Sequence, residues 1–148
     1  MATLVLAEHD HGALAATTAR IVNAVGSLGP VHLLVAGERA GEAASAVALA
    51  GVEKVLVIES ASEGAPEALV SVLESLAPAY THIVAAAATA GRDLIPRLAA
   101  RLDLMPVTDI VAIHGPDRFD RPIYAGNAVE TITSSQPRQL LTIRASAF

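Results

Sequence analysis

The chain has 148 residues, the size of one domain, and 53% of them are hydrophobic while only 3% are aromatic. This composition excludes a disordered chain and predicts a core built from Ala, Val, Leu and Ile. The sequence contains no cysteine, which excludes disulfides, thiol catalysis and cysteine-ligated metals. A net charge of −5 and the scarcity of aromatic residues predict no nucleic-acid partner, because such binding depends on phosphate neutralisation and base stacking.

Short apolar runs alternate with longer stretches of helical period over the first hundred residues. Strands are predicted at 4–7, 31–35, 54–58 and 80–86, and helices at 14–25, 42–49, 62–76 and 90–102. Pro96 cannot donate a backbone hydrogen bond, so we expect the last of these helices to begin near Asp93. Strand–helix repeats predict right-handed crossovers and a parallel sheet with helices on both faces. The third and fourth strands are apolar throughout, which predicts burial on both sides.

The pattern changes after Met105 and Pro106, where strands follow one another without helices between them. Strands are predicted at 107–113, 121–125, 128–133 and 139–144, with Gly126 and Asn127 as a two-residue hairpin turn. Strands joined in this way predict an antiparallel extension. The predicted fold class is therefore α/β, with three α/β/α layers, a mostly parallel sheet and a small antiparallel β annex near residues 107–144, in a single domain over residues 1–148.

Few residues carry recognisable chemistry. The loops that follow the strands contain no GxGxxG, Walker or GxSxG motif. Residues 8–11 (EHDH) place two histidines at a spacing that would put both on one side of a strand. Two such ligands need a third from elsewhere, and a polar loop at a strand end is the simpler interpretation. We predict no metal site and no catalytic residue.

The segment 89–93 is the candidate ligand-binding loop. It follows the fourth strand and opens a helix, at the edge where open α/β sheets bind their ligands. Thr89 could cap this helix, Gly91 would allow close backbone approach, and Arg92 could face an anion. A capped helix start with Arg92 at the rim is the alternative interpretation. The candidate cofactor-binding residues are Thr89, Gly91, Arg92 and Asp93.

The longest apolar run covers residues 83–88, far short of the roughly 20 residues that a membrane span requires. The first residues include no basic leader and reach a carboxylate at Glu8, unlike a secretion signal. We expect a cytoplasmic protein without membrane insertion.

Several stretches resemble the large (alpha) subunit of electron-transfer flavoproteins. They are 4–10 (LVLAEHD), 81–84 (THIV), 91–100 (GRDLIPRLAA), 106–110 (PVTDI), 121–128 (RPIYAGNA) and the closing residues 142–144 (TIR) with Phe148. Each motif alone is weakly specific, but together they cover essentially the whole chain. The resemblance implies a nucleotide alpha-hydrolase-like version of the three-layer fold.

The same resemblance implies a function. Members of that family are longer, and their C-terminal domain carries the principal FAD-binding residues. This chain is then the N-terminal domain alone, excised or truncated, so we expect no cofactor in it and FAD in the full-length protein. It would be a structural and subunit-docking domain. The full heterodimer with the beta subunit carries electrons from flavin dehydrogenases, such as those of fatty acid beta-oxidation, to a quinone reductase of the respiratory chain.

The sequence also raises two alternative functions and predicts one property of the isolated chain. A stand-alone adenine-nucleotide-binding module of the universal-stress type shares the architecture but would need a glycine-rich phosphate loop late in the chain, which we do not find. An enzyme acting by itself would need an acid–base or nucleophile pair, and none is visible. Surface that a missing domain normally covers would allow the isolated chain to self-associate.

Overall fold

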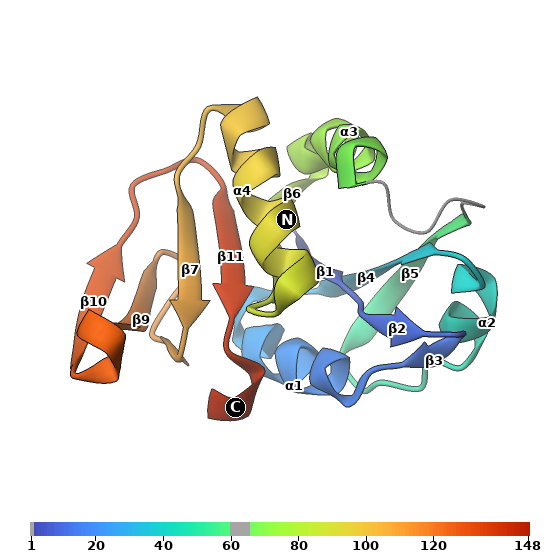
Figure 1. Ribbon diagram of the computed structural model, residues 1–148, viewed down its shortest axis with the longest axis horizontal. Helices are drawn as coiled ribbons and strands as arrows, with labels where there is room; N and C mark the ends of the chain where they lie inside the picture. Colours follow the sequence, from blue (N-terminus) through green and yellow to red (C-terminus); the bar gives the residue numbers. More distant parts are fainter. Residues whose placement is uncertain (1, 60–65) are drawn as a thin grey trace.

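A six-stranded sheet forms the centre of the computed structural model, which describes residues 2–59 and 66–148 (Figure 1). Its strands are β1 (Ala2–Leu6), β4 (Val31–Gly37), β5 (Val52–Glu59), β6 (Tyr80–Ala86), β7 (Pro106–Ile110) and β11 (Gln139–Ile143). They lie in the order β5-β4-β1-β6-β11-β7, and every neighbouring pair is parallel. The predicted parallel sheet is confirmed.

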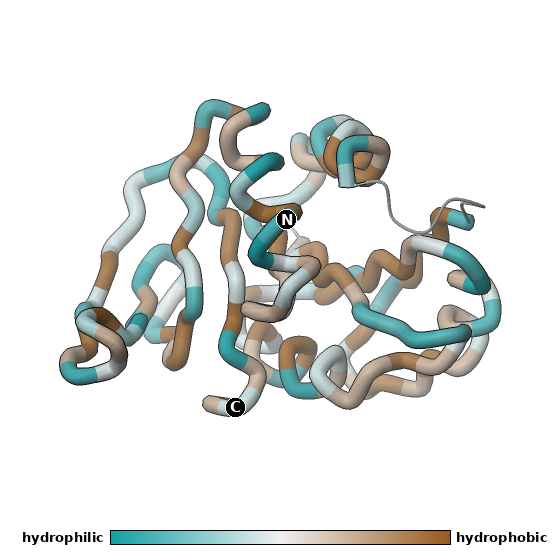
Figure 2. Tube along the Cα trace, in the orientation of Figure 1, coloured by the Kyte–Doolittle hydropathy of each residue, from teal (hydrophilic) through white to brown (hydrophobic). Residues whose placement is uncertain are grey.

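Helices cover both faces of this sheet (Figure 1). The part of the chain that the structure describes contains the α-helices α1 (Ala16–Val25), α2 (Ala40–Ser45), α3 (Pro66–Leu76) and α4 (Thr89–Leu102). It also contains the short 3-10 segments η1 (Gly26–Leu28), η2 (Ala77–Ala79), η3 (Tyr124–Gly126) and η4 (Ala145–Ala147). Val5 of β1 packs in the core on the side of α1 and α2, whereas Leu4 and Leu6 pack in the core on the side of α3 and α4. Successive strand residues point to opposite faces, so an apolar strand serves both cores. In Figure 2 the tube through the centre of the molecule is mostly brown, the colour of hydrophobic residues. The three-layer fold class is confirmed.

The antiparallel annex is smaller than the sequence predicted. It contains β8 (Ala112–Ile113), β9 (Arg118–Ile123) and β10 (Ala128–Thr133), in the order β10-β9-β8. The predicted strands at 107–113 and 139–144 mostly form β7 and β11, which belong to the parallel sheet, so placing them in the annex was wrong. Two neighbouring parallel strands are joined by a crossover of a dozen or more residues, which is usually but not always a helix. Here β8, β9 and β10 supply it in place of a helix.

The predicted two-residue hairpin turn in the annex is also wrong. Ile123 of β9 pairs with Ala128 of β10, so four residues form the connection. Tyr124, Ala125 and Gly126 all have positive φ angles, of 49°, 54° and 89°. The chain therefore makes a left-handed turn before Asn127 rather than turning at Gly126 and Asn127 alone.

Two further predictions were wrong because tertiary packing decided the outcome. The strand predicted at 54–58 is β5, which lies at the edge of the sheet and is not buried on both faces; Val57 is 45% exposed. Helix α4 begins at Thr89, with Pro96 inside it, rather than near Asp93. Pro96 and Arg92 are both exposed, so the Arg92 carbonyl that loses its helical partner lies on the solvent side.

The other predicted helices agree apart from their ends: α1 and α2 are shorter than predicted, and the predicted start of α3 at 62–65 lies outside the described residues. Within the described ranges, no helix has the length and hydrophobicity needed to cross a membrane.

His82 joins the annex to the main sheet. This β6 residue is buried, and its Nε2–H donates a hydrogen bond of 2.7 Å to the carbonyl oxygen of Pro116, in the loop between β8 and β9. Because a carbonyl oxygen can only accept, Nε2 carries the proton, and Nδ1 is free to accept from the Thr81 hydroxyl at 2.9 Å. Burial lowers the pKa of His82 below its ordinary 6.5, and the bond to Pro116 opposes this effect only in part.

We expect His82 to make the chain less stable in mild acid. Below about pH 6.5 the unfolded histidine binds a proton that the folded one resists, so the free energy of unfolding falls as the pH is lowered from about 7.5 through the ordinary pKa of 6.5. Urea titrations at several pH values measure this slope. The slope should flatten in His82→Gln and persist in His11→Gln, whose side chain is 80% exposed. An unchanged slope in His82→Gln would show that other groups cause it.

Candidate functional site

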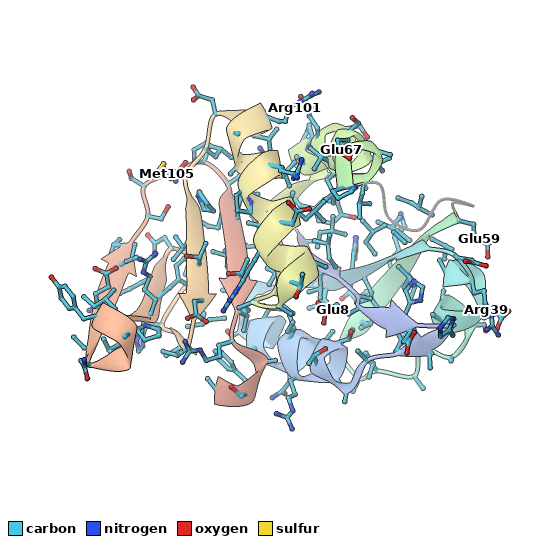
Figure 3. The ribbon with its side chains drawn as sticks, viewed as in Figure 1. Glu8, Arg39, Glu59, Glu67, Arg101 and Met105 are labelled. Carbon is cyan, nitrogen blue, oxygen red and sulfur yellow. The ribbon has the colours of Figure 1, made fainter. Side chains whose placement is uncertain are left out.

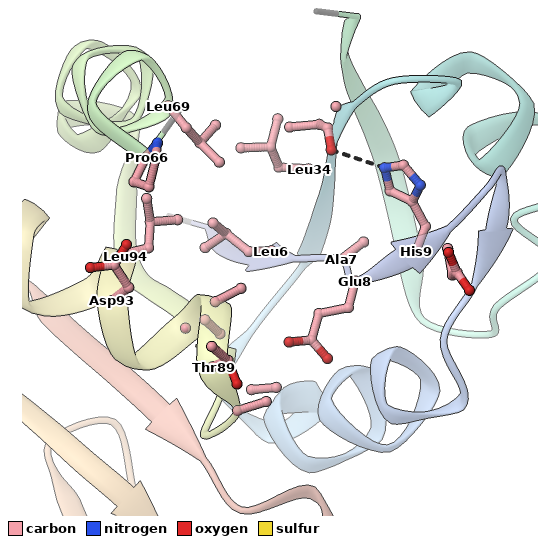
Figure 4. Close-up of a pocket in the computed structure, with 18 of the residues that line it drawn as sticks. Leu6, Ala7, Glu8, His9, Leu34, Pro66, Leu69, Thr89, Asp93 and Leu94 are labelled. Carbon is pink, nitrogen blue, oxygen red and sulfur yellow. Dashed lines mark hydrogen bonds between the residues drawn. The ribbon is translucent and has the colours of Figure 1, made fainter. Parts of the chain in front are cut away.

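A cavity of about 680 Å³ opens at the carboxyl ends of β1, β4 and β6 (Figure 4). After β1 the chain builds β4 and β5 on one side and then crosses back to place β6 on the other side. The carboxyl ends of the neighbouring strands β1 and β6 therefore mark the topological switch point, where open α/β sheets bind ligands. The apolar part of the lining includes Leu6, Leu34, Leu69, Leu94 and Pro66.

The start of α4 forms one wall of the cavity and contains the predicted binding residues. Thr89, Gly91 and Asp93 line it, whereas Arg92 is exposed and is not among the lining residues. The cap residue of α4 is Ala88, and it makes no side-chain capping bond, so the predicted capping role of Thr89 was wrong. The Asp93 carboxylate accepts a hydrogen bond of 2.8 Å from Nε of Arg97.

Gly91 is required by packing. A Cβ atom added at this position would lie 2.0 Å from the backbone carbonyl oxygen of Ala86, at the end of β6. The close approach predicted for this glycine is therefore made by the protein's own backbone. The space that a side chain would take at Gly91 is already filled.

A short hairpin, where the sequence predicted a polar loop, forms the opposite wall. Its strands are β2 (His9–Asp10) and β3 (Ala13–Leu14), joined by a turn at His11 and Gly12 with positive φ angles. Nε2–H of His9 donates a hydrogen bond of 2.9 Å to the carbonyl oxygen of Ala36, and its Nδ1 is buried without a protein partner in the described part of the chain.

The turn also separates the two histidines that the sequence placed on one side of a strand. Nε2 of His11 instead lies 3.4 Å from an Asp10 carboxylate oxygen, and both side chains are at least 80% exposed. Over residues 2–59 and 66–148, no three His, Asp or Glu side chains are grouped in a way that could hold a metal ion.

Glu8 is the polar residue between these two walls. Its carbonyl oxygen accepts bonds from the backbone N–H of Ala15 and from the Thr18 hydroxyl, which also lies 3.2 Å from the Glu8 N–H. The Glu8 side chain is half-buried and lines the cavity (Figure 4). Its carboxylate accepts a hydrogen bond of 3.2 Å from the Thr17 hydroxyl. Glu8 was not among the site residues predicted from the sequence. The available signal was a carboxylate directly after a strand at the switch point.

A doubly wound parallel sheet with a cavity at its switch point defines a broad class of α/β proteins that bind ligands at the carboxyl edge of the sheet. Within that class the sequence matches the family described as "Electron transfer flavoprotein domain" over residues 3–148. The chain belongs to this family.

Its relatives are alpha subunits. The chain is 42% identical over 152 residues to the electron transfer flavoprotein subunit alpha of Pseudomonas aeruginosa and 44% identical over 152 residues to that of Paracoccus denitrificans. Both alignments cover 100% of this chain and 49% of the relative. The mitochondrial alpha subunit of Arabidopsis thaliana is 40% identical over 161 residues, with 44% of its length covered. The chain thus spans about half the length of these curated relatives, in their N-terminal part. The resemblance to alpha subunits is confirmed.

Proposed function

We propose that this chain is a structural and subunit-docking domain of an electron-transfer flavoprotein alpha subunit, an electron carrier rather than an enzyme. Family membership over residues 3–148 supports the flavoprotein context. The observation that carries the scaffold role is the start of α4. The segment that enters α4, residues 87–90 (AATA), contains no glycine that would let a pyrophosphate approach the backbone, and Gly91 is taken up by packing against Ala86.

The charges around the cavity support the same conclusion. Arg39, labelled in Figure 3, lines the cavity, but its guanidinium is held by both carboxylate oxygens of Glu42, at 3.0 and 2.6 Å. Glu8 and Asp93 line the cavity with carboxylates, and their negative charge would repel the phosphate of an incoming ligand. The residues of this cleft do not fit the pyrophosphate of FAD or the phosphate of AMP. We therefore propose that FAD binds elsewhere in the full-length protein.

The remaining parts of the proposal concern the whole protein. Its relatives are named as subunits, which supports a beta-subunit partner. Flavin dehydrogenases as electron donors and a quinone reductase as acceptor complete the proposed path. We also propose that residues 1–148 form a single domain. A cytoplasmic location stays a prediction, because the relatives include bacterial proteins and proteins named as mitochondrial.

Flavin and nucleotide titrations test the scaffold role. We expect the 148-residue chain to purify colourless and to give no calorimetric signal with micromolar FAD, AMP or ATP, because the cleft lacks a phosphate-binding loop. A yellow chain with stoichiometric flavin would contradict the proposal that FAD binds elsewhere in the full-length protein. Micromolar binding of ATP would favour the universal-stress alternative, and Thr89 and Asp93 would be the first residues to substitute.

Mixing with a bacterial beta subunit tests the docking role. We expect binding that is measurable by sedimentation but weaker than that of a full-length alpha subunit, since about half of the relatives' length is not represented. The full-length alpha subunit of Pseudomonas aeruginosa serves as the positive control. Complete absence of binding at high concentration would contradict a docking role.

A further inference from the structure

The proposed scaffold role does not require the cavity at the switch point, yet the size and lining of this cavity suit a small ligand. Its volume of about 680 Å³ falls within the range of about 300–1,000 Å³ typical of small-molecule sites. Leu6 and Leu34 come from two neighbouring strands of the sheet, and Leu69 and Leu94 come from α3 and α4. Figure 4 shows these side chains around one side of the cavity. They form an apolar surface suited to a flat hydrophobic group.

The net charge of the residues that line the cavity determines whether a cationic or an anionic ligand is favoured. Among the described residues that line the cavity, four are carboxylates and one is a guanidinium, which gives a formal charge of −3 with neutral histidines; the five are Glu8, Asp10, Glu38, Asp93 and Arg39. The N-terminus of α4 adds only about half a positive charge. The carboxylates therefore outweigh the helix dipole, and the cavity favours a cation.

Glu8 is the carboxylate best placed to receive that cation. Arg39 and Asp93 are already engaged by Glu42 and Arg97. Asp10 and Glu38 are exposed, whereas Glu8 is half-buried. For Glu8, the described part of the chain supplies a single hydroxyl bond from Thr17 and no ion pair. The backbone of Glu8 is held by Ala15 and Thr18, and its side chain lines the same cavity as the leucines.

We propose that this cleft binds a small organic cation with a planar apolar body, whose N–H groups donate hydrogen bonds to the Glu8 carboxylate. Hydrogen bonds between a cationic donor and a carboxylate are stronger than neutral ones, and half-burial limits their competition with water. The apolar body covers Leu34, Leu69 and Leu94. This inference does not rest on the docking role, because it concerns only the cleft.

Three isosteric probes test the proposal on the 148-residue chain. Benzamidinium carries the proposed charge, benzamide is its neutral counterpart, and benzoate is the anion. Each is titrated at low ionic strength while the backbone amide signals are followed by NMR. We expect benzamidinium to bind about tenfold more tightly than benzamide, equivalent to about 1.4 kcal/mol, and to shift the signals of Ala7, Glu8 and Thr89. We expect benzoate to bind most weakly.

Two substitutions assign the preference to Glu8. Glu8→Gln should remove the tenfold advantage of benzamidinium and leave benzamide unchanged. Asp103→Asn removes an exposed carboxylate outside the cavity and should change neither affinity. If Glu8→Gln does not fold, added salt provides the same test on the unsubstituted chain, because it screens the ionic part of the attraction alone.

Equal affinities for benzamidinium and benzamide, tighter binding of benzoate, or shifts confined to residues outside the cavity would each overturn the proposal. None of these results would bear on beta-subunit binding, which is measured separately.

Discussion

Phe119→Ala is expected to lower the free energy of unfolding by about 3–5 kcal/mol, the range for loss of a buried aromatic ring that leaves a cavity. Phe119 lies on β9 in the annex, yet it is fully buried in the core that also contains Val107 and Ile110 of β7. It is one of the largest fully buried side chains among the described residues. Loss of its ring should loosen the attachment of the annex to the main sheet as well as the core. Urea unfolding followed by circular dichroism measures the change.

Tyr124→Ala is the matched control for Phe119→Ala. Tyr124 is also an aromatic residue of the annex, but 78% of it is exposed. We expect its removal to change the free energy of unfolding by less than about 0.5 kcal/mol, as for most surface substitutions. If the two variants lost equal stability, burial of Phe119 would not be the cause.

Gly91→Ala is the second substitution with a large expected effect. An alanine Cβ would lie 2.0 Å from the Ala86 carbonyl oxygen, a distance that real Cβ atoms do not reach. The neighbouring atom belongs to the backbone of a central strand, so α4 must move away from β6. We expect a loss of at least about 3 kcal/mol, more than the ordinary cost of overpacking and in spite of the higher helix propensity of alanine. Thermal and urea unfolding measure this loss.

Gly26→Ala is the matched control, because it measures the effect of replacing a glycine by alanine where no steric clash arises. Gly26 is exposed, has a helical φ of −57°, and would meet no atom within 4 Å if a Cβ were added. Alanine restricts the unfolded chain there, so we expect a change between zero and a gain of about 1 kcal/mol. A Gly91→Ala variant as stable as Gly26→Ala would show that α4 tolerates displacement from β6.

The candidate site was only partly predictable. The position of segment 89–93 followed from the rule that parallel strands present their carboxyl ends at one edge, and the structure places Thr89, Gly91 and Asp93 in the lining of that cavity. The environment of Glu8 could not be predicted. Its partners Thr17 and Thr18 lie on α1, and they meet it only after the β2–β3 hairpin has reversed the chain.

The sequence by itself determined the alternation of strands and helices up to residue 102 and the three-layer class, because these depend on apolar periods that are local to each segment. Only the tertiary structure decided that β11 lies between β6 and β7, that β5 is an edge strand and that α4 runs through Pro96. An apolar run specifies a strand but not its neighbours, since strand pairing depends on contacts between residues far apart in the chain. Likewise, the tolerance of Pro96 depends on the freed Arg92 carbonyl lying on the solvent side, which local sequence does not encode.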